Sequence, residues 1–197
     1  VLAKAGATVS DGARPDIDIE KAYRLYLNLL SSAMSAGVPD DQIKAAQEYV
    51  ASLQEMDQSD SAVSSRGSVQ IHGDWIRNAG RREVLRLAWR EFFEDWDILI
   101  CPQQPTPAFP HDHSPQEERV LMVDNQEIPY MRQVFWAGII ILAQLPSTVF
   151  PTGPSSEGLP IGLQAVSGEF NDYVCIDFVR LLSQEIGGFM PPPGYDD

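Results

Sequence analysis

The chain has 197 residues, of which 44% are hydrophobic and 9% aromatic, and this size and composition favour a single folded domain over residues 1–197 and argue against a disordered or fibrous protein. Its 14 lysines and arginines stand against 28 aspartates and glutamates, which gives a formal net charge of −14. Such a surface repels phosphate backbones and anionic lipid headgroups, so we expect neither a nucleic acid nor a membrane as a partner.

The cysteines and the hydropathy of the chain indicate whether to expect a metal site and in which compartment the protein resides. Neither Cys101 nor Cys175 has a second cysteine or a histidine at metal-ligand spacing, and we expect both to be buried, reduced thiols. The longest uncharged apolar run, residues 134–150, is interrupted by Gln144 and Pro146 and is shorter than the ~20 residues that a membrane span needs. These features predict a cytoplasmic protein without a metal site.

The first part of the chain predicts a helical region. Residues 1–5 are typical of the end of a helix and residues 7–10 of a short strand, an αβ unit without its beginning, so we expect a processed or truncated polypeptide. Apolar residues at three- and four-residue spacing then predict a helix over 19–36 and a second over 42–56, which should form a hairpin.

The middle of the chain predicts a loop, a helix and a strand. Residues 57–68 are rich in serine, aspartate and glutamine and indicate an internal surface loop. Asp74 should cap a long helix that reaches Phe93 with one apolar face. The continuous apolar run at 98–102 is typical of a strand covered on both faces, and we expect it to be the central strand. The five prolines of the segment 102–115 then predict an irregular loop of the kind that lines pockets.

The last part of the chain predicts a hairpin between two helices. Residues 130–143 have the length and apolar content of a buried helix, and a terminal helix should cover 170–186. Residues 147–151 and 161–166 are strand-like, and the segment between them is too short for a parallel crossover, so we expect an antiparallel pair.

The histidines do not form a convincing catalytic or metal site. His111 and His113 alternate in sequence but stand between Pro110 and Pro115, which favours an exposed loop over a strand that would present both rings on one face. A Gly-x-Ser-x-Gly nucleophile turn is absent from the sequence. We therefore assign neither a metal nor a Ser-His-Asp triad to this chain.

A motif near the carboxy terminus identifies a family. Residues 158–164 are Gly-Leu-Pro-Ile-Gly-Leu-Gln, and the sequence resembles the carboxy-terminal part of the amidase-signature hydrolases, whose chains carry a Gly-Leu-Pro-x-Gly-Leu-Gln strand. Residues 97–102 are similar to the family's Asp-Val-Leu-Leu-x-Pro strand, and order and spacing agree from about residue 74 to 195. The resemblance implies an α/β fold, the carboxy-terminal part of a mixed β-sheet flanked by helices. It implies structural roles for five residues: Pro102, Gly158, Pro160, Gly162 and Gln164.

The chain departs from the family pattern at two levels. Ile141 and Gln144 stand where relatives usually have asparagine and glycine. The family's Ser-Ser-Lys triad, in a glycine- and serine-rich loop, has no match in this sequence. The turn at 153–158 is a poor substitute for that loop, because Pro154 has no backbone N–H to donate and Glu157 would bring a negative charge close to a developing oxyanion. We therefore expect no catalytic residue in this chain.

The resemblance implies a function for a larger protein. Its activity would be hydrolysis of linear amide C–N bonds in a small-molecule substrate through a serine acyl-enzyme, with no cofactor and with the triad supplied by a missing amino-terminal portion. The substrate cleft would have a wall from this half, with Thr106, Phe109, Phe135 and Trp136 as candidates by position, although Phe135 and Trp136 are equally expected as core aromatics.

Two further expectations follow from an incomplete fold. A chain cut from a larger enzyme exposes strand edges and apolar surface, so we expect a homo-oligomer. The alternative is a stand-alone binding or assembly module that kept this part of the fold and has no catalysis. The length of the natural reading frame distinguishes the two, since the enzyme requires several hundred codons upstream.

Overall fold

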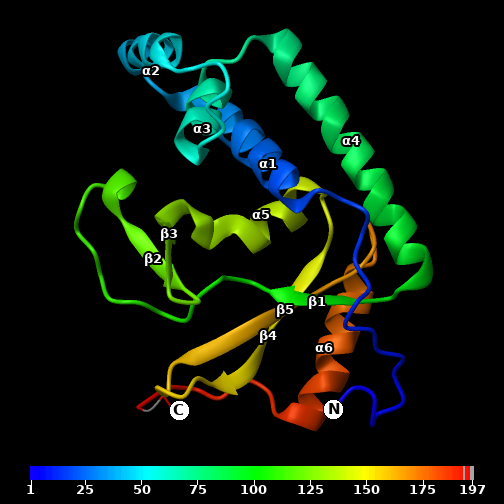
Figure 1. The fold of residues 1–197 in the computed structure, drawn as a ribbon. Helices are drawn as coiled ribbons and strands as arrows, with labels where there is room; N and C mark the ends of the chain where they lie inside the picture. The colour runs from blue at the N-terminus through cyan, green and yellow to red at the C-terminus, as the bar shows by residue number, and fades with distance from the viewer. Residues whose placement is uncertain (193, 196–197) are drawn as a thin grey trace.

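The computed structural model describes residues 1–192, 194 and 195, with the side chain of Glu117 outside the description, and consists of a helical layer on one side of a small sheet and a further helix on the other (Figure 1). The helices are α1 (Ile19–Met34), α2 (Asp40–Ser52), α3 (Asp60–Ser68), α4 (His72–Asp95), α5 (Phe135–Leu142) and α6 (Asp172–Ile186). The strands are β1 (Leu99–Pro102), β2 (Val120–Val123), β3 (Gln126–Pro129), β4 (Ser147–Pro154) and β5 (Pro160–Val166), and the short 3-10 helices are η1 (Ser35–Gly37), η2 (Gln116–Glu118) and η3 (Tyr130–Val134). The expected α/β class is confirmed.

The main sheet has the strand order β1-β5-β4, with all pairings antiparallel. Strands β4 and β5 pair from Ser147 opposite Val166 to Pro154 opposite Pro160, which confirms the predicted antiparallel hairpin. The prediction that residues 98–102 form the central strand is wrong, because β1 lies at one edge of the described sheet and β5 lies at its centre. An apolar run reports that a strand is covered, whereas its place in the sheet depends on which distant strand pairs with it.

Two apolar cores lie on the two faces of this sheet. Cys101 and Val166 belong to the core formed with α1 and α5, whereas Ile100 and Ala165 pack into the core formed with α6. Neighbouring residues of a strand point to opposite faces, so each of these two strands contributes alternate side chains to the two cores. Leu99 is only partly buried, which is expected at the sheet edge.

Helix α3 occupies the segment predicted as the surface loop 57–68. Ser59 caps it by accepting a hydrogen bond from the amide of Ala62 at 3.4 Å, and Ala62 and Val63 are buried. The loop prediction is wrong because the polar composition of the segment does not show that these two apolar residues are packed. Packing against α1 stabilises a short helix whose intrinsic propensity is weak.

Three further differences concern local structure. The segment 7–10 belongs to no helix or strand, and the segment 130–143 begins as the 3-10 helix η3 before α5 starts. Strands β2 and β3 form a hairpin that the sequence reading missed. Its turn is Asp124-Asn125, where both residues have positive φ (50° and 63°), the conformation that a two-residue hairpin turn requires.

The long helices bury only part of the faces that periodicity predicted. Helix α4 begins at His72, two residues before the expected cap Asp74, and Trp89 is buried whereas Trp75 is 37% exposed. In α6, Leu182 is buried but Leu181 is 49% exposed. In the described chain, part of the apolar face predicted for each helix is therefore exposed to solvent. None of the described helices combines the length and apolar character needed to cross a membrane.

The carboxy-terminal end of α5 explains one departure from the family pattern. Gln144 has φ of 58°, its amide donates to the carbonyl of Ile141 (3.0 Å), and the amide of Leu145 donates to the carbonyl of Ile140 (3.3 Å). This pair of bonds is a Schellman motif, whose left-handed position favours glycine. The glycine expected from the family pattern at this place would thus adopt the conformation without strain.

Helices α1 and α3 are in close contact at Gly67. A methyl group on Gly67 would lie 2.4 Å from the carbonyl oxygen of Asn28, and this neighbour is backbone that cannot rotate away. The crossing therefore requires a residue without a side chain.

We predict that Gly67→Ala lowers the free energy of unfolding by about 2 kcal/mol, because the helices must separate to admit the methyl group. Gly80→Ala is the matched control: Gly80 lies in α4 with open space around it, and there alanine should stabilise by about 0.5–1 kcal/mol. Urea denaturation followed by circular dichroism measures both. Equal effects of the two substitutions would contradict the close crossing.

We predict that Gln144→Gly stabilises the protein by about 0.5–1 kcal/mol, because glycine removes the cost of the left-handed conformation while losing some entropy on folding. Thermal denaturation measures the change, with Gln133→Gly in η3 as a control that should destabilise. A loss of stability in Gln144→Gly would show that the glutamine side chain has a role that its backbone does not reveal.

Candidate functional site

The predicted substrate wall is built by the loop after β1, the β2–β3 hairpin, η3 and α5. The hairpin brings Arg119 beside Tyr130, whose amide donates to the Arg119 carbonyl at 3.1 Å. The Arg119 guanidinium lies 5.5 Å from the centre of the Tyr130 ring, and Phe109 meets the same ring edge-to-face at 6.0 Å. These contacts hold the proline-rich loop against the hairpin.

Thr106 and Phe109 line one hollow of about 510 Å³ together with Tyr130, and Glu157 comes from the β4–β5 turn. The structure thus brings these two predicted wall residues together. Phe109 is 37% exposed, and the Thr106 hydroxyl is buried with no hydrogen-bond partner among the described atoms. The Thr106 hydroxyl is thus an unsatisfied buried polar group in the wall of the hollow.

Phe135 and Trp136 line a second hollow, of about 520 Å³, whose other residues include Glu20, Asp60 and Arg132. The four predicted wall residues are therefore divided between two neighbouring hollows, which adjoin at the consecutive residues Pro105 and Thr106. Phe135 also packs against the core, at 4.9 Å from the ring of Tyr23. Phe135 therefore belongs to the core and also lines the second hollow, and its role as a substrate wall stays a prediction.

Arg132 is the polar centre of the second hollow. Its guanidinium donates to Glu20 and to Asp60, each at 3.0 Å, and lies 4.6 Å from the centre of the Tyr23 ring. Burial acts to lower the pKa of Arg132, but the hydrogen bonds and charges of Glu20 and Asp60 outweigh it and raise that pKa. This arginine joins α1, α3 and η3, and sequence reasoning missed it, although a lone cation at the start of an apolar run was a usable signal.

Tyr23 holds the backbone next to Arg132 in place. Its hydroxyl donates to the carbonyl of Met131 at 3.1 Å, which fixes the backbone next to Arg132. Burial, followed by the negative charge of Asp60, raises the pKa of Tyr23 well above its ordinary value. The phenol therefore remains neutral and keeps its role as a donor.

The residues of the family motif have structural roles. Gln164 is 2% exposed, and its Nε2 donates to the carbonyl of Pro102 at 2.9 Å, which fixes the start of the proline-rich loop. Gly162 lies where a Cβ would approach the Phe150 carbonyl to 3.1 Å, and Gly158 has φ of 81° in the turn that ends before Pro160.

Ser155 in that turn is engaged with backbone groups. Its Oγ accepts hydrogen bonds from the amides of Glu157 and Leu159, both at 3.2 Å. The segment is thus a serine-stabilised turn. Among the described residues the three lysines are exposed, and Lys21 pairs with Asp18 at 3.0 Å, so none has the desolvated setting of a general base.

The described residues contain no group of three or more histidines, cysteines, aspartates or glutamates that could hold a metal ion. Cys101 and Cys175 are buried and free. Burial raises the pKa of the Cys101 thiol to about 11, and burial likewise raises that of Cys175. Thiols with raised pKa values are poor nucleophiles at neutral pH.

A family model described as Amidase matches residues 1–176 of the chain. This chain belongs to the amidase family. It is 29% identical over 120 residues to an indoleacetamide hydrolase of Bradyrhizobium diazoefficiens, covering 57% of this chain and 20% of that protein. It is also 29% identical over 112 residues to the human fatty-acid amide hydrolase 2, covering 56% of this chain and 18% of that one.

Solved structures show the same fold. A crystal structure of an amidase superposes with a TM-score of 0.63 at 21% identity, covering 86% of this chain and 36% of the other. At this identity the likeness concerns the fold alone. The amidase-family chain described here spans about a fifth of the length of the two curated relatives.

We predict that Arg132→Gln lowers the free energy of unfolding by about 2 kcal/mol, because it leaves the mostly buried Asp60 carboxylate without its partner. Arg180→Gln is the control, since its pair with Asp177 is more than half exposed on both sides and should contribute less than about 1 kcal/mol. Chemical denaturation compares the two. Equal losses would remove Arg132 as the polar centre of the second hollow.

Proposed function

We propose that this chain is the carboxy-terminal segment of an amidase that cleaves linear amide bonds in small molecules, and that it contributes a wall of the substrate cleft without supplying the nucleophile. The observation that carries the proposal is the match of the amidase model to residues 1–176 in a chain that spans about a fifth of the curated relatives. The two relatives named above are hydrolases of amides, which supports this reaction class.

The proposed reaction divides its groups between two portions of the enzyme. A serine of the amino-terminal portion attacks the amide carbonyl, the amine leaves with a proton, and water then cleaves the ester to release the acid. A lysine and a second serine of that portion would move the protons, and no cofactor is required. Thr106, Phe109, Phe135 and Trp136 of this chain would face the substrate.

The uncovered surfaces support a second portion of the enzyme. Strands β1 and β4 each have a free edge in the described sheet. Phe170 and Tyr173 at the start of α6 are 87% and 85% exposed, and Phe189 beyond its end is 81% exposed. Unpaired strand edges and large exposed apolar side chains are typical of surfaces that another domain or another chain covers. We propose that the amino-terminal portion covers them in the intact enzyme, and that a homo-oligomer covers them when this chain is alone.

The proposed compartment is the cytoplasm. Two cysteines remain free and buried, which fits a reducing environment. The alternative function is a non-catalytic binding or assembly module, and the exposed position of all three lysines is expected of this module and of the proposed enzyme segment alike. A reading frame that begins near Val1 would support this module, and one with a serine-rich loop several hundred codons upstream would support the enzyme.

We predict that the 197-residue chain alone releases no ammonia or amine from aliphatic and aromatic amides, and that joining it to the portion encoded upstream gives turnover. Ammonia release over a panel of primary amides measures this. Ser155→Ala in the joined enzyme should leave the rate unchanged, because Ser155 holds a turn. Turnover by the chain alone that is lost in Ser155→Ala would overturn the proposal.

A further inference from the structure

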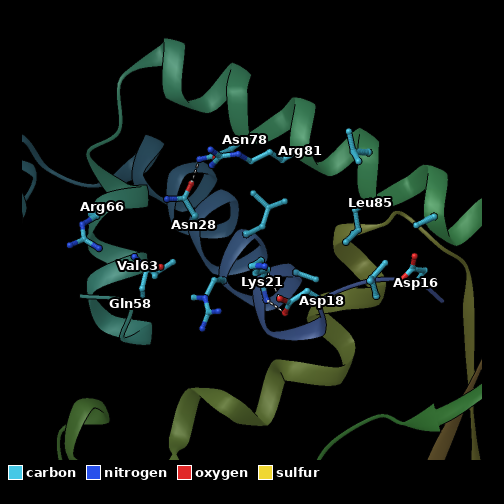
Figure 2. Close-up of a pocket in the computed structure, with 16 residues that line it drawn as sticks. Asp16, Asp18, Lys21, Asn28, Gln58, Val63, Arg66, Asn78, Arg81 and Leu85 are labelled. Atoms are coloured by element: carbon cyan, nitrogen blue, oxygen red, sulfur yellow. Dashed lines mark hydrogen bonds and ion pairs between the residues drawn. The ribbon is translucent and has the colours of Figure 1, made fainter. Parts of the chain in front are cut away.

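A cavity of about 550 Å³ lies between α1, α3 and α4, on the helical layer and apart from the two hollows of the candidate wall (Figure 2). It shares only Gln58 with the second hollow and no residue with the first. Its floor includes the apolar side chains of Leu25, Val63 and Leu85. The volume is that of an ordinary small-molecule site.

The charges around this cavity are unusual for so acidic a chain. Seven of its 14 lysines and arginines form no ion pair with a carboxylate that the structure describes. Three of these seven residues line this one cavity: Arg24, Arg66 and Arg81. Of the 28 acidic residues only Asp16 and Asp18 line it, and Asp18 is already paired with a lysine. The lining of the cavity therefore has an excess of positive charge, since Lys21 and three arginines stand against Asp16 and Asp18.

A fixed hydrogen-bond network holds the polar end of the cavity. Asn78, which is 9% exposed, donates through Nδ2 to Asn28 Oδ1 at 2.8 Å and to Gln70 Oε1 at 3.1 Å. Arg81 donates through one nitrogen to Asn78 Oδ1 at 2.9 Å. A guanidinium has five N–H donors, so most of those of Arg81 remain available in a position that the amide network defines.

Arg24 of α1 also lines the cavity. Arg24 precedes Asn28 by one turn of α1, and Arg81 follows Asn78 by one turn of α4. The helices run in opposite directions, with Asp18 and Leu85 at one end of the cavity and Asn28 and Asn78 at the other (Figure 2). Both arginines therefore lie on the same side of the bond between the two asparagines.

Arg66 adds charge at the rim and is held differently. Its guanidinium donates to the backbone carbonyls of Gln54, at 2.8 Å, and of Asp57. These bonds fix the loop between α2 and α3 and are made to backbone oxygens rather than to carboxylates. Arg66 is thus a structural residue that also contributes to the field of the cavity.

We propose that this cavity binds a small organic oxyanion, with a carboxylate or phosphate headgroup at Arg24 and Arg81 and a short apolar body on Leu25, Val63 and Leu85. Arginine forks match the oxygens of both headgroups. The net charge of −14 repels anions elsewhere on the chain, so binding depends on these two residues. The site is independent of amide hydrolysis.

Isothermal titration calorimetry with inorganic phosphate, acetate and hexanoate, at constant ionic strength in chloride, tests the site. Saturable one-to-one binding by phosphate or by hexanoate is expected, and whichever binds more tightly identifies the headgroup. Hexanoate should bind more tightly than acetate, because only hexanoate reaches the apolar floor. Equal affinities of these two would overturn the apolar body of the ligand.

Arginine variants provide the decisive comparison. The double variant Arg24→Gln, Arg81→Gln should bind more than tenfold more weakly, which corresponds to about 1.4 kcal/mol. Arg77→Gln removes the same charge from α4 outside the cavity and should bind as the parent does. Binding by the double variant at the parent affinity, or an absence of saturable binding by every probe, would overturn the site. Circular dichroism confirms that the variants remain folded.

Discussion

Strand β5 is packed on both of its faces, and the arrangement of the other elements depends on this constraint. Ala165 and Val166 are fully buried, yet they face different cores because adjacent side chains of a strand point to opposite sides. Each face therefore requires its own apolar cover, which α5 with α1 gives on one side and α6 on the other. Gln164, between the same two cores, uses its side chain to hold Pro102 of the neighbouring strand.

A few arginines connect parts of the chain that are distant in sequence. Arg132 joins η3 to α1 and α3, and Arg86 joins α4 to Glu169 just before α6. The remaining ion pairs are mostly between residues three apart on one helix and contribute little to stability. Arg132 and Arg86 therefore connect segments that are far apart in the chain, whereas most of the other ion pairs act within one helix.

The candidate wall and the oxyanion cavity use the same helices in different ways. Helix α1 presents Glu20 toward Arg132 and the aromatic hollow, and it presents Asn28 toward α4, while Arg24 lines the cavity. Glu20, Arg24 and Asn28 follow one another at intervals of four residues, so they form one row along α1, and this row winds slowly around the helix axis. One helix can therefore support a substrate wall and a separate anion site, and neither needs a movement of the other.

The sequence by itself determined the family, the α/β class and the β4–β5 hairpin, because the motif at residues 158–164 and the short connection are local features. The five prolines of residues 102–115 also predicted a pocket-lining loop, and the resemblance to the family named Thr106 and Phe109 within it. Only the tertiary structure decided that β1 is an edge strand, that 60–68 is helical, and that Arg132 lies between two carboxylates. Each of these depends on contacts between residues far apart in the chain, whose partners no local pattern of hydropathy or composition identifies.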